Sequence, residues 1–375
     1  MTDSKKDPVI DVLQLTGGND YMNTVVPHSN SQYWDYRPNV NIKEDEVIRL
    51  NDQVGLHPSM GPIAEMYRKG NVAIIHGVGY ENSPRSHFGL MDIWHTCEPE
   101  TLGTEGWLGR AVSQIDPMKE NVVTAVSMGP ALFMALAVPG VPVATVDDLE
   151  NYGLLTDVSP EKKRDRMLDR YKRIYSPVIG SGPVMDFLGQ TGLDALKGAD
   201  VLNVAPQLYS STLEYGNNAI SKKLRSIAQI HLAQVGTRVF YCDLGSFDTH
   251  ADQLATHDNL WSAASTAIRD FFDDLEEHQA ADNVVMFLFS EFGRRVYDNG
   301  AGTDHGAGGV CLAIGSGVRG GEYGEYPSMK ESDLDQGDLV PTIAFRGVYS
   351  TLIEDWMKLD PFSVVGGTFE KPSFI

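Results

Sequence analysis

The stretch NVVMFLFSEFGRRVYDNGAGTDHGAGG, residues 283–309, changes character abruptly after Phe289. Residues 283–289 form an apolar run of the kind found in strands that are buried on both faces of a parallel sheet. Residues 290–309 then contain one Glu, two Arg, two Asp, one His and six Gly. So many charges and glycines directly after a core strand indicate either a surface loop or a site for a metal ion or an anion at the strand end.

Apolar runs bounded by glycine or polar residues recur along the chain, at residues 9–15, 71–79, 122–129, 237–245 and 309–315. Helical patterns alternate with them, and helices are expected at residues 61–69, 251–278 and 348–359, the second with a break near Asn259. This alternation predicts an α/β fold, a three-layer α/β/α sandwich in which helices cover both faces of a mostly parallel central sheet.

Residues 1–375 are expected to form a single domain that carries one insertion. Residues 157–234 are helix-rich, contain the charged stretch SPEKKRDRMLDRYKRIY and interrupt the alternation of strands and helices. We therefore predict that this helical insertion caps the cleft at the strand ends and sets the choice of substrate.

The composition limits the classes of partner. The chain has 375 residues, of which 51 are acidic and 30 are basic, so its net charge is −21. Such an acidic surface argues against nucleic acid and against an anionic membrane. It favours a small anionic or polar molecule, bound where Arg or a metal reverses the local charge, and it leaves oligomerisation open.

The N-terminal residues and the cysteines bear on location. Residues 1–18 have neither the apolar segment of an export signal nor a twin arginine, and no apolar window is long enough to span a membrane. The three cysteines form no disulfide framework, and Cys242 and Cys311 lie in apolar runs where buried thiols are expected. A cytoplasmic location is therefore expected, although a chain whose leader had been removed would look the same.

Polar clusters follow four of the expected strands, in TGGNDYMNT, HGVGYENSPRSHF, DLGSFDTHADQ and SEFGRR. Binding sites in open parallel sheets form at the carboxyl ends of the strands. We therefore expect four separate segments to deliver polar side chains to one edge of the sheet.

Two stretches offer ligands for a metal ion. FDTHADQ holds Asp248 and His250, whose carboxylate and imidazole suit Zn²⁺, Mn²⁺ or a similar divalent cation. TDHG adds Asp304 and His305. The alternatives are a helix start capped by Thr249 and a glycine turn with a surface histidine.

Other residues are candidates for catalysis. Glu291, at the end of a strand, could ligate a metal or act as a base, and Arg294 could neutralise an anion; the alternative is a surface ion pair. Ser86 stands at an expected helix start, where its hydroxyl is either a nucleophile or a helix cap. His87 would line the site beside it, and Arg85 would contact the substrate.

Three further residues could contact a metal or a substrate. Asn19 and Asp20 follow the first strand, where substrate binding by Asn19 and metal binding by Asp20 compete with an ordinary glycine turn. His76 ends the second strand, where it either lines the cleft or is a core histidine.

The motifs LTGGNDYMNTVVP, GLHPSM, PRSHF, GWLGR, FDTHADQ, SEFGRR, GTDHGAGG and IAFRGVY occur in this order. In this order they resemble the DUF1501 family of uncharacterised bacterial proteins along nearly the whole chain. The resemblance implies the alkaline-phosphatase-like (sulfatase-like) superfamily, which holds sulfatases, phosphodiesterases and metal-dependent phosphomutases. It implies one or two divalent metals at the strand ends and a Ser, Thr or modified Cys nucleophile.

By this resemblance, Asp248 and His250 fall near the first metal position, and His305 falls at the last histidine ligand. Ser86 lies near the position of the nucleophile. In the superfamily, the loop after the first strand usually carries an Asp that ligates the metal. The candidates for this position are Asn19 and Asp20.

The chain also departs from the superfamily pattern. Glu291 and Phe292 stand where an Asp-His pair usually follows a strand, which argues against a full two-metal site. The sulfatase motif C-x-P-x-R is absent, so formylglycine chemistry is not expected. Most relatives begin with a twin-arginine export signal, which this sequence lacks.

The favoured hypothesis is a metal-dependent hydrolase of a phosphate or sulfate ester, with Zn or Mn preferred to Ca or Mg and with attack by Ser86 or by water. One alternative is a metal-dependent lyase, isomerase or phosphoryl-shift enzyme acting on a small polar substrate. Another is a non-catalytic binding protein with a degenerate site, because a fold does not fix a function.

Overall fold

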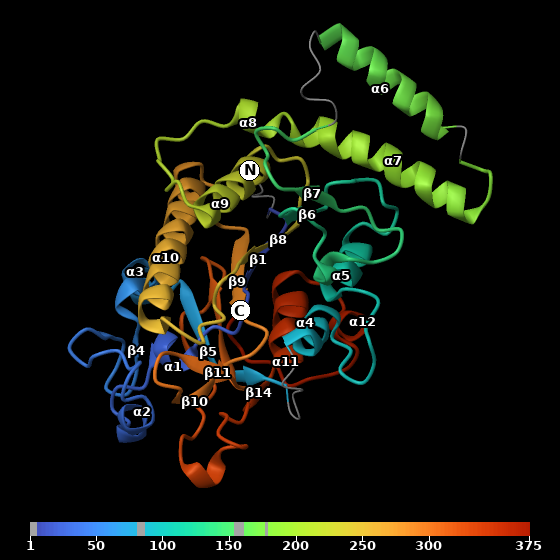
Figure 1. Cartoon of the computed structure of the whole chain (residues 1–375). Helices are drawn as coiled ribbons and strands as arrows, with labels where there is room; N and C mark the ends of the chain where they lie inside the picture. The colour runs from blue at the N-terminus through green and yellow to red at the C-terminus, as the bar shows by residue number, and fades with distance from the viewer. Residues whose placement is uncertain (1–5, 81–86, 154–160, 177–178) are drawn as a thin grey trace.

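Strands and helices alternate along the chain, as Figure 1 shows for the computed structural model of the protein. The structure describes residues 6–80, 87–153, 161–176 and 179–375. The strands of the main sheet are β1 (Val9–Leu15), β5 (Val72–Gly79), β6 (Ala125–Met128), β7 (Ala144–Val146), β8 (Val239–Leu244), β9 (Val284–Phe289), β12 (Gly309–Ile314), β13 (Gly321–Tyr323) and β14 (Ile343–Ala344). Short strands outside this sheet are β2 (Val25–Val26), β3 (Ile48–Arg49), β4 (Gly55–Leu56), β10 (Arg294–Asp298) and β11 (Thr303–His305). The helices are α1 (Tyr21–Thr24), α2 (Ser31–Tyr36), α3 (Gly61–Arg68), α4 (His87–Thr96), α5 (Trp107–Ile115), α6 (Glu161–Tyr175), α7 (Pro183–Leu202), α8 (Ala205–Leu208), α9 (Ala219–Leu232), α10 (Gln253–Glu277), α11 (Phe345–Ser350) and α12 (Pro361–Val365).

The main sheet has nine strands, and helices lie on both of its faces (Figure 1). Its order is β13-β5-β12-β9-β1-β8-β6-β7, and β14 pairs with β5. The strand pairs are parallel except for those of β12, which runs antiparallel to β5 and β9. The predicted three-layer α/β/α sandwich with a mostly parallel sheet is therefore confirmed.

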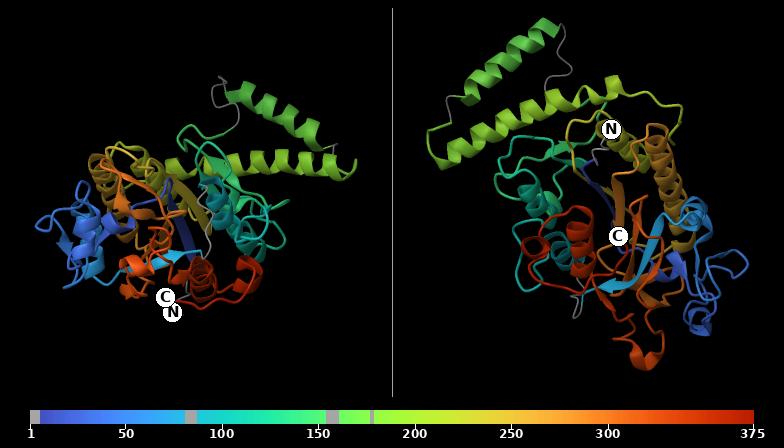
Figure 2. Two further views of the ribbon diagram at one scale, coloured as in Figure 1. Left: turned by 60° about the horizontal axis from the view of Figure 1, so that its bottom comes forward. Right: turned by 180° about the vertical axis from the view of Figure 1, so that it is seen from behind.

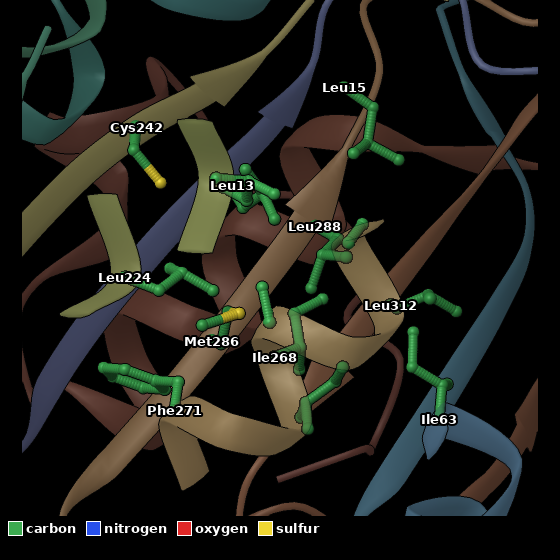
Figure 3. Packing of buried hydrophobic residues seen from close by; sticks show 14 of the residues in the cluster. Leu13, Leu15, Ile63, Leu224, Cys242, Ile268, Phe271, Met286, Leu288 and Leu312 are labelled. Carbon is green, nitrogen blue, oxygen red and sulfur yellow. The ribbon is translucent and has the colours of Figure 1, made fainter. Parts of the chain in front are cut away.

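The side chains of β1 alternate between two hydrophobic cores, one on each face of the sheet. Val9, Leu13 and Leu15 belong to the core that includes residues of α3, α9 and α10, which Figure 3 shows from close by. Ile10 and Val12 belong to the core that includes residues of α4, α5 and α11. A central strand that is buried on both faces must be apolar almost throughout, which explains why such runs marked the sheet in the sequence.

Two of the predicted helices differ in detail from the structure. Helix α10 continues from Gln253 to Glu277 without a break at Asn259. It starts after Asp252, whose φ of 49° lies in the left-handed region, so Thr249 is not its N-cap. The predicted helix at residues 348–359 begins earlier, as α11, and passes into a π-helical segment over Thr351–Trp356.

Helices α6, α7 and α8 of the insertion lie away from β10 and β11 (Figures 1 and 2), whereas the Lys223 ammonium group of α9 donates to Asp243 near the carboxyl end of β8. The Lys197 ammonium group of α7 donates to the carbonyl of Glu120, which precedes β6. Leu202 and Ala205 belong to the core beneath α9 and α10, and this burial draws α7 and α8 towards the amino ends of the strands. Helices α6, α7 and α8 of the predicted insertion thus do not cover the strand ends next to β10 and β11, and the influence of residues 157–234 on the choice of substrate stays a prediction.

No helix in the described part of the chain combines the length and the apolar character that are needed to cross a bilayer.

Candidate metal centre

Asp248, His250 and His305 bring one ligand atom each to a common point. These three atoms all lie within 4.8 Å of one another. Oδ1 of Asp248 is 3.0 Å from Nε2 of His250 and 3.0 Å from Nε2 of His305. The first two residues follow β8 and the third ends β11, so the fold joins two segments that are far apart in the sequence. The structure thus brings together the three main ligands that the sequence predicted.

The hairpin of β10 and β11 carries His305 to this point. The two strands pair antiparallel with Arg294 opposite His305. The carbonyl of Thr249 accepts from the backbone N–H of Thr303 at 3.1 Å, which ties the hairpin to the loop after β8. A Cβ at Gly302 would stand 2.1 Å from the Thr249 oxygen. The glycines after the core strand thus allow two ligand-bearing backbones to approach closely.

Arg294 is a positioning residue for Asp248. Its guanidinium is buried and donates to Oδ1 of Asp248 at 2.7 Å. It also donates to four backbone carbonyls, those of Gly17, Gly18, Phe247 and Thr303. The prediction that Arg294 neutralises a bound anion is therefore wrong, because the protein encloses the guanidinium.

The charge of Asp248 is set by these neighbours. Burial raises the pKa of the carboxyl group, but the hydrogen bonds from Arg294 and His305 outweigh burial, and the pKa is lowered on balance. A metal ligand must be ionised, so this environment favours the ligating form of Asp248.

Asp304 orients His250. Its Oδ1 is 2.9 Å from Nδ1 of His250, and this contact is the main cause of the lowered pKa of Asp304. The side-chain amide of Asn299 donates to the same oxygen at 3.4 Å and to the carbonyl of His250 at 3.1 Å. A carboxylate at Nδ1 keeps the proton there and leaves the Nε2 lone pair for a metal. Asp304, predicted as a ligand, is outside the convergent group and holds one of its members instead.

Phe292 packs against His305, with 4.4 Å between the ring centroids. The neighbouring turn makes room for the phenyl ring, because a Cβ at Gly18 would stand 2.1 Å from its Cε2 atom. Burial lowers the pKa of His305 against the opposing effect of Asp248, which favours the neutral imidazole that a metal requires. Phe292 thus supports one of the three converging residues by packing.

Glu291 belongs to a buried polar network. Its carboxylate accepts from the backbone N–H of Gly17 at 2.8 Å and from Nε2 of Gln14 at 3.2 Å. Oε1 of Gln14 in turn contacts Nε2 of His95 at 2.9 Å and accepts from the hydroxyl of Tyr241. Glu291 is not part of the convergent group found among the described residues. The sequence did not reveal Gln14, His95 or Tyr241, because each lies within a strand or helix pattern that is otherwise apolar.

Asp20 forms a buried ion pair with Arg37 and lies outside the convergent group found among the described residues, so its role as a metal ligand stays a prediction. Its carboxylate also accepts from the side-chain amide of Gln253. Burial raises the pKa of Asp20, but the charge and the hydrogen bond of Arg37 outweigh burial and lower it. Arg37 carried no signal in the sequence, because it lies in a short irregular region with no motif.

Asn19 and His76 are buried and are held by hydrogen bonds to other side chains of the protein. Oδ1 of Asn19 accepts three side-chain hydrogen bonds, from Thr24, His257 and Trp261. The two ring nitrogens of His76 lie 2.7 Å from the hydroxyl of Tyr21 and 3.2 Å from the carboxylate of Glu322. The core-histidine alternative for His76 is the one that the structure supports.

The predicted nucleophile segment is only partly described. Ser86 and Arg85 lie outside the described residues, so their roles stay predictions. His87 is the first residue of α4, and its side chain is not described.

The convergent donor set fits a divalent transition-metal ion. One carboxylate and two imidazole nitrogens are typical ligands of catalytic zinc centres, which keep a further coordination position open. Ca²⁺ and Mg²⁺ prefer sets composed of oxygen atoms. The side chains of Asp248 and His250 are 53% and 45% exposed, so a small molecule can reach this point from solvent.

Residues 198–350 match the family model described as "Protein of unknown function (DUF1501)", a range that contains all three convergent residues. The resemblance of the motifs and the match of this family model agree over this part of the chain. A comparison with curated proteins gave no match.

Solved structures show a general likeness to the chain. Ps i-CgsB is 11% identical over 97% of this chain and 75% of its own, with a TM-score of 0.45. A 2-O GAG sulfatase is 10% identical over 98% and 76% of the two chains, with a TM-score of 0.41. The lipoteichoic acid synthase LtaP from Listeria monocytogenes is 9% identical over 96% and 74%, with a TM-score of 0.41. Likenesses at this level transfer no activity to this chain.

Proposed function

We propose that this chain is a metal-dependent hydrolase of phosphate or sulfate esters that holds one divalent cation with Asp248, His250 and His305. The observation that carries the proposal is the convergence of their ligand atoms, all within 4.8 Å of one another. The class of substrate follows from the resemblance of the motifs to an ester-cleaving superfamily. Zn²⁺ and Mn²⁺ suit the donor set best.

The surrounding residues are arranged to hold these ligands in one geometry. Arg294 fixes Asp248 from the buried side, and Asp304 fixes His250 through Nδ1. A cation bound there would polarise an ester oxygen and lower the pKa of an attacking hydroxyl or water. Arg294 also offsets the charge of Asp248, which reduces the repulsion that an anionic ester meets at this edge of an acidic protein.

The environment of Glu291 favours one cation over two. The carboxylate is fully buried and accepts hydrogen bonds from Gly17 and Gln14. The adjacent Phe292 offers no ligand atom at all. A second site at these positions would need further donors, and Phe292 supplies none.

Hydrolysis of an aryl phosphate and an aryl sulfate by zinc- or manganese-loaded protein tests the proposal. We expect turnover of one of the two esters, its loss on chelation, and its loss in Asp248→Ala. Asp282→Asn is the matched control, because Asp282 is also an exposed carboxylate, paired with Lys6 at 2.7 Å. Tight metal binding without turnover of either ester would instead support the non-catalytic binding protein.

A further inference from the structure

The helices α6 and α7 form an arm, residues 161–176 and 179–202, that projects from the body of the protein in all three views of Figures 1 and 2. The two helices approach closely where α7 has a glycine. A Cβ at Gly192 would stand 2.5 Å from Cδ1 of Tyr175 in α6. The arm is therefore a packed hairpin rather than two independent helices.

The two ends of α7 differ in their surroundings. Leu196 and Leu202, in the C-terminal half, are 2% and 0% exposed, and this half anchors the arm to the body. Val184, Phe187 and Leu188, in the N-terminal half, are 70%, 54% and 50% exposed. Their spacing of three and four residues places them along one stripe of the helix. This stripe is an apolar face without a partner in the described residues.

Apolar exposure is concentrated in this arm. Seven of the sixteen large hydrophobic side chains that are exposed in the described chain belong to it, namely Met167, Ile174, Ile179, Val184, Met185, Phe187 and Leu188. Exposed apolar side chains that gather in one part of a soluble protein can mark an interaction site, whereas single ones do not.

The charges of the two helices are complementary. Helix α6, EKKRDRMLDRYKRIY, has seven basic and three acidic residues, although the whole chain carries a net charge of −21. Helix α7, PVMDFLGQTGLDALKGADVL, has three Asp and one Lys. A two-fold interface brings the same patch of both subunits together and therefore requires a self-complementary surface. The arm meets this requirement, because the basic α6 of one copy can face the acidic α7 of another.

We propose that the apolar face of the arm is an interface with a second copy of this chain, in which α6 of each copy lies along α7 of the other. The exposed stripe of α7 becomes the centre of the interface, and the charged residues form its rim. This partner fits better than an anionic membrane. The chain carries a net charge of −21, which opposes binding to an anionic lipid surface.

Sedimentation velocity of the full chain over a series of micromolar concentrations tests the proposal. We expect a concentration-dependent dimer for the unaltered chain. The double variant Phe187→Ser/Leu188→Ser should weaken the dimer by at least about thirtyfold, because truncation of central apolar side chains has effects of this size. Phe362→Ser is the matched control, since Phe362 lies outside the arm and is similarly exposed, at 62%. It should dimerise like the unaltered chain.

A second variant keeps the test independent of the apolar substitutions. Arg170→Glu/Arg173→Glu removes the charge complementarity of α6 and should also weaken the dimer, with an unchanged circular dichroism spectrum. A chain that stays monomeric at every concentration would overturn the proposal, as would a dimer that neither arm variant weakens. Sedimentation of the chain with vesicles of anionic phospholipid, lost in the Phe187 variant, would assign the face to a membrane and would also overturn it.

Discussion

Asp11 gives the stability of this fold a defined dependence on pH. It lies in the middle of β1, paired with Phe240 on one side and Met286 on the other, and it is fully buried. Neither of its carboxylate oxygens has a hydrogen-bond partner in the described residues. Burial therefore raises the pKa of Asp11 from 3.8 to about 7.

The sign of the effect follows from the two states of the chain. Between pH 4 and pH 7 the unfolded chain releases the proton of Asp11 while the folded chain retains it. The free energy of unfolding therefore falls as the pH rises through this window and is level above it. At about 1.4 kcal/mol per pKa unit, the contribution of Asp11 is about 4 kcal/mol over the whole window and about 3 kcal/mol between pH 5 and pH 8.

Urea unfolding of Asp11→Asn at pH 5 and pH 8, with chelator present throughout, measures this contribution. The variant removes the titrating group, so its unfolding free energy relative to the unaltered chain should rise by about 3 kcal/mol from pH 5 to pH 8. Asp282→Asn, at an exposed carboxylate, should show no such change. A difference between Asp11→Asn and the unaltered chain that is the same at both pH values would refute the reasoning.

Substitutions at Asp304, Arg37 and Gly18 test the packing in and around the site. Asp304→Asn should lower the metal affinity, measured by titration calorimetry, by about 10- to 100-fold with little change in stability, because it weakens the contact that orients the imidazole of His250. An unchanged metal affinity would show that Asp304 does not orient His250 for metal binding. Arg37→Met should lower the unfolding free energy by about 3–5 kcal/mol, since it leaves Asp20 charged and buried, and adding Asp20→Asn should recover part of the loss in urea unfolding. Gly18→Ala should lower the free energy of unfolding by about 2–5 kcal/mol, because the φ of Gly18 is +83° and a Cβ there would overlap the ring of Phe292. Gly61→Ala is the control and should be neutral or mildly stabilising, because the space around Gly61 is open. Equal melting temperatures for the two glycine variants would contradict the close packing of the turn.

The sequence predicted the parts of this protein that depend on local pattern. Strands such as β1 and β9 are buried on both faces, so almost all of their consecutive residues are apolar and the run can be recognised in the sequence. Asp248 and His250 were recognisable because they follow a strand in a short motif, and His305 because it lies in a second motif of the same kind. The rule that sites form at the carboxyl ends of strands then places them at one edge.

Pairing between distant residues was not predictable in the same way. Asp20 looked free in its glycine turn until Arg37 was found against it, and Arg294 looked available until the fold placed five acceptors around it. The position of the helical insertion also depends on where Leu202 and Ala205 are buried, not on its helical content. Residues of the right chemical type identify candidates, and their tertiary partners decide which of them remain accessible.

Elemental analysis of the purified chain, loaded with zinc or manganese and then dialysed against metal-free buffer, tests the central claim most directly. Asp248, His250 and His305 converge within 4.8 Å, so we predict one equivalent of metal in the unaltered chain and none in His250→Ala/His305→Ala. The variant His28→Ala/His278→Ala is the matched control, because both histidines lie outside the convergent group, and it should retain the metal. Equal metal content in the unaltered chain and in His250→Ala/His305→Ala would contradict the assignment of the metal centre.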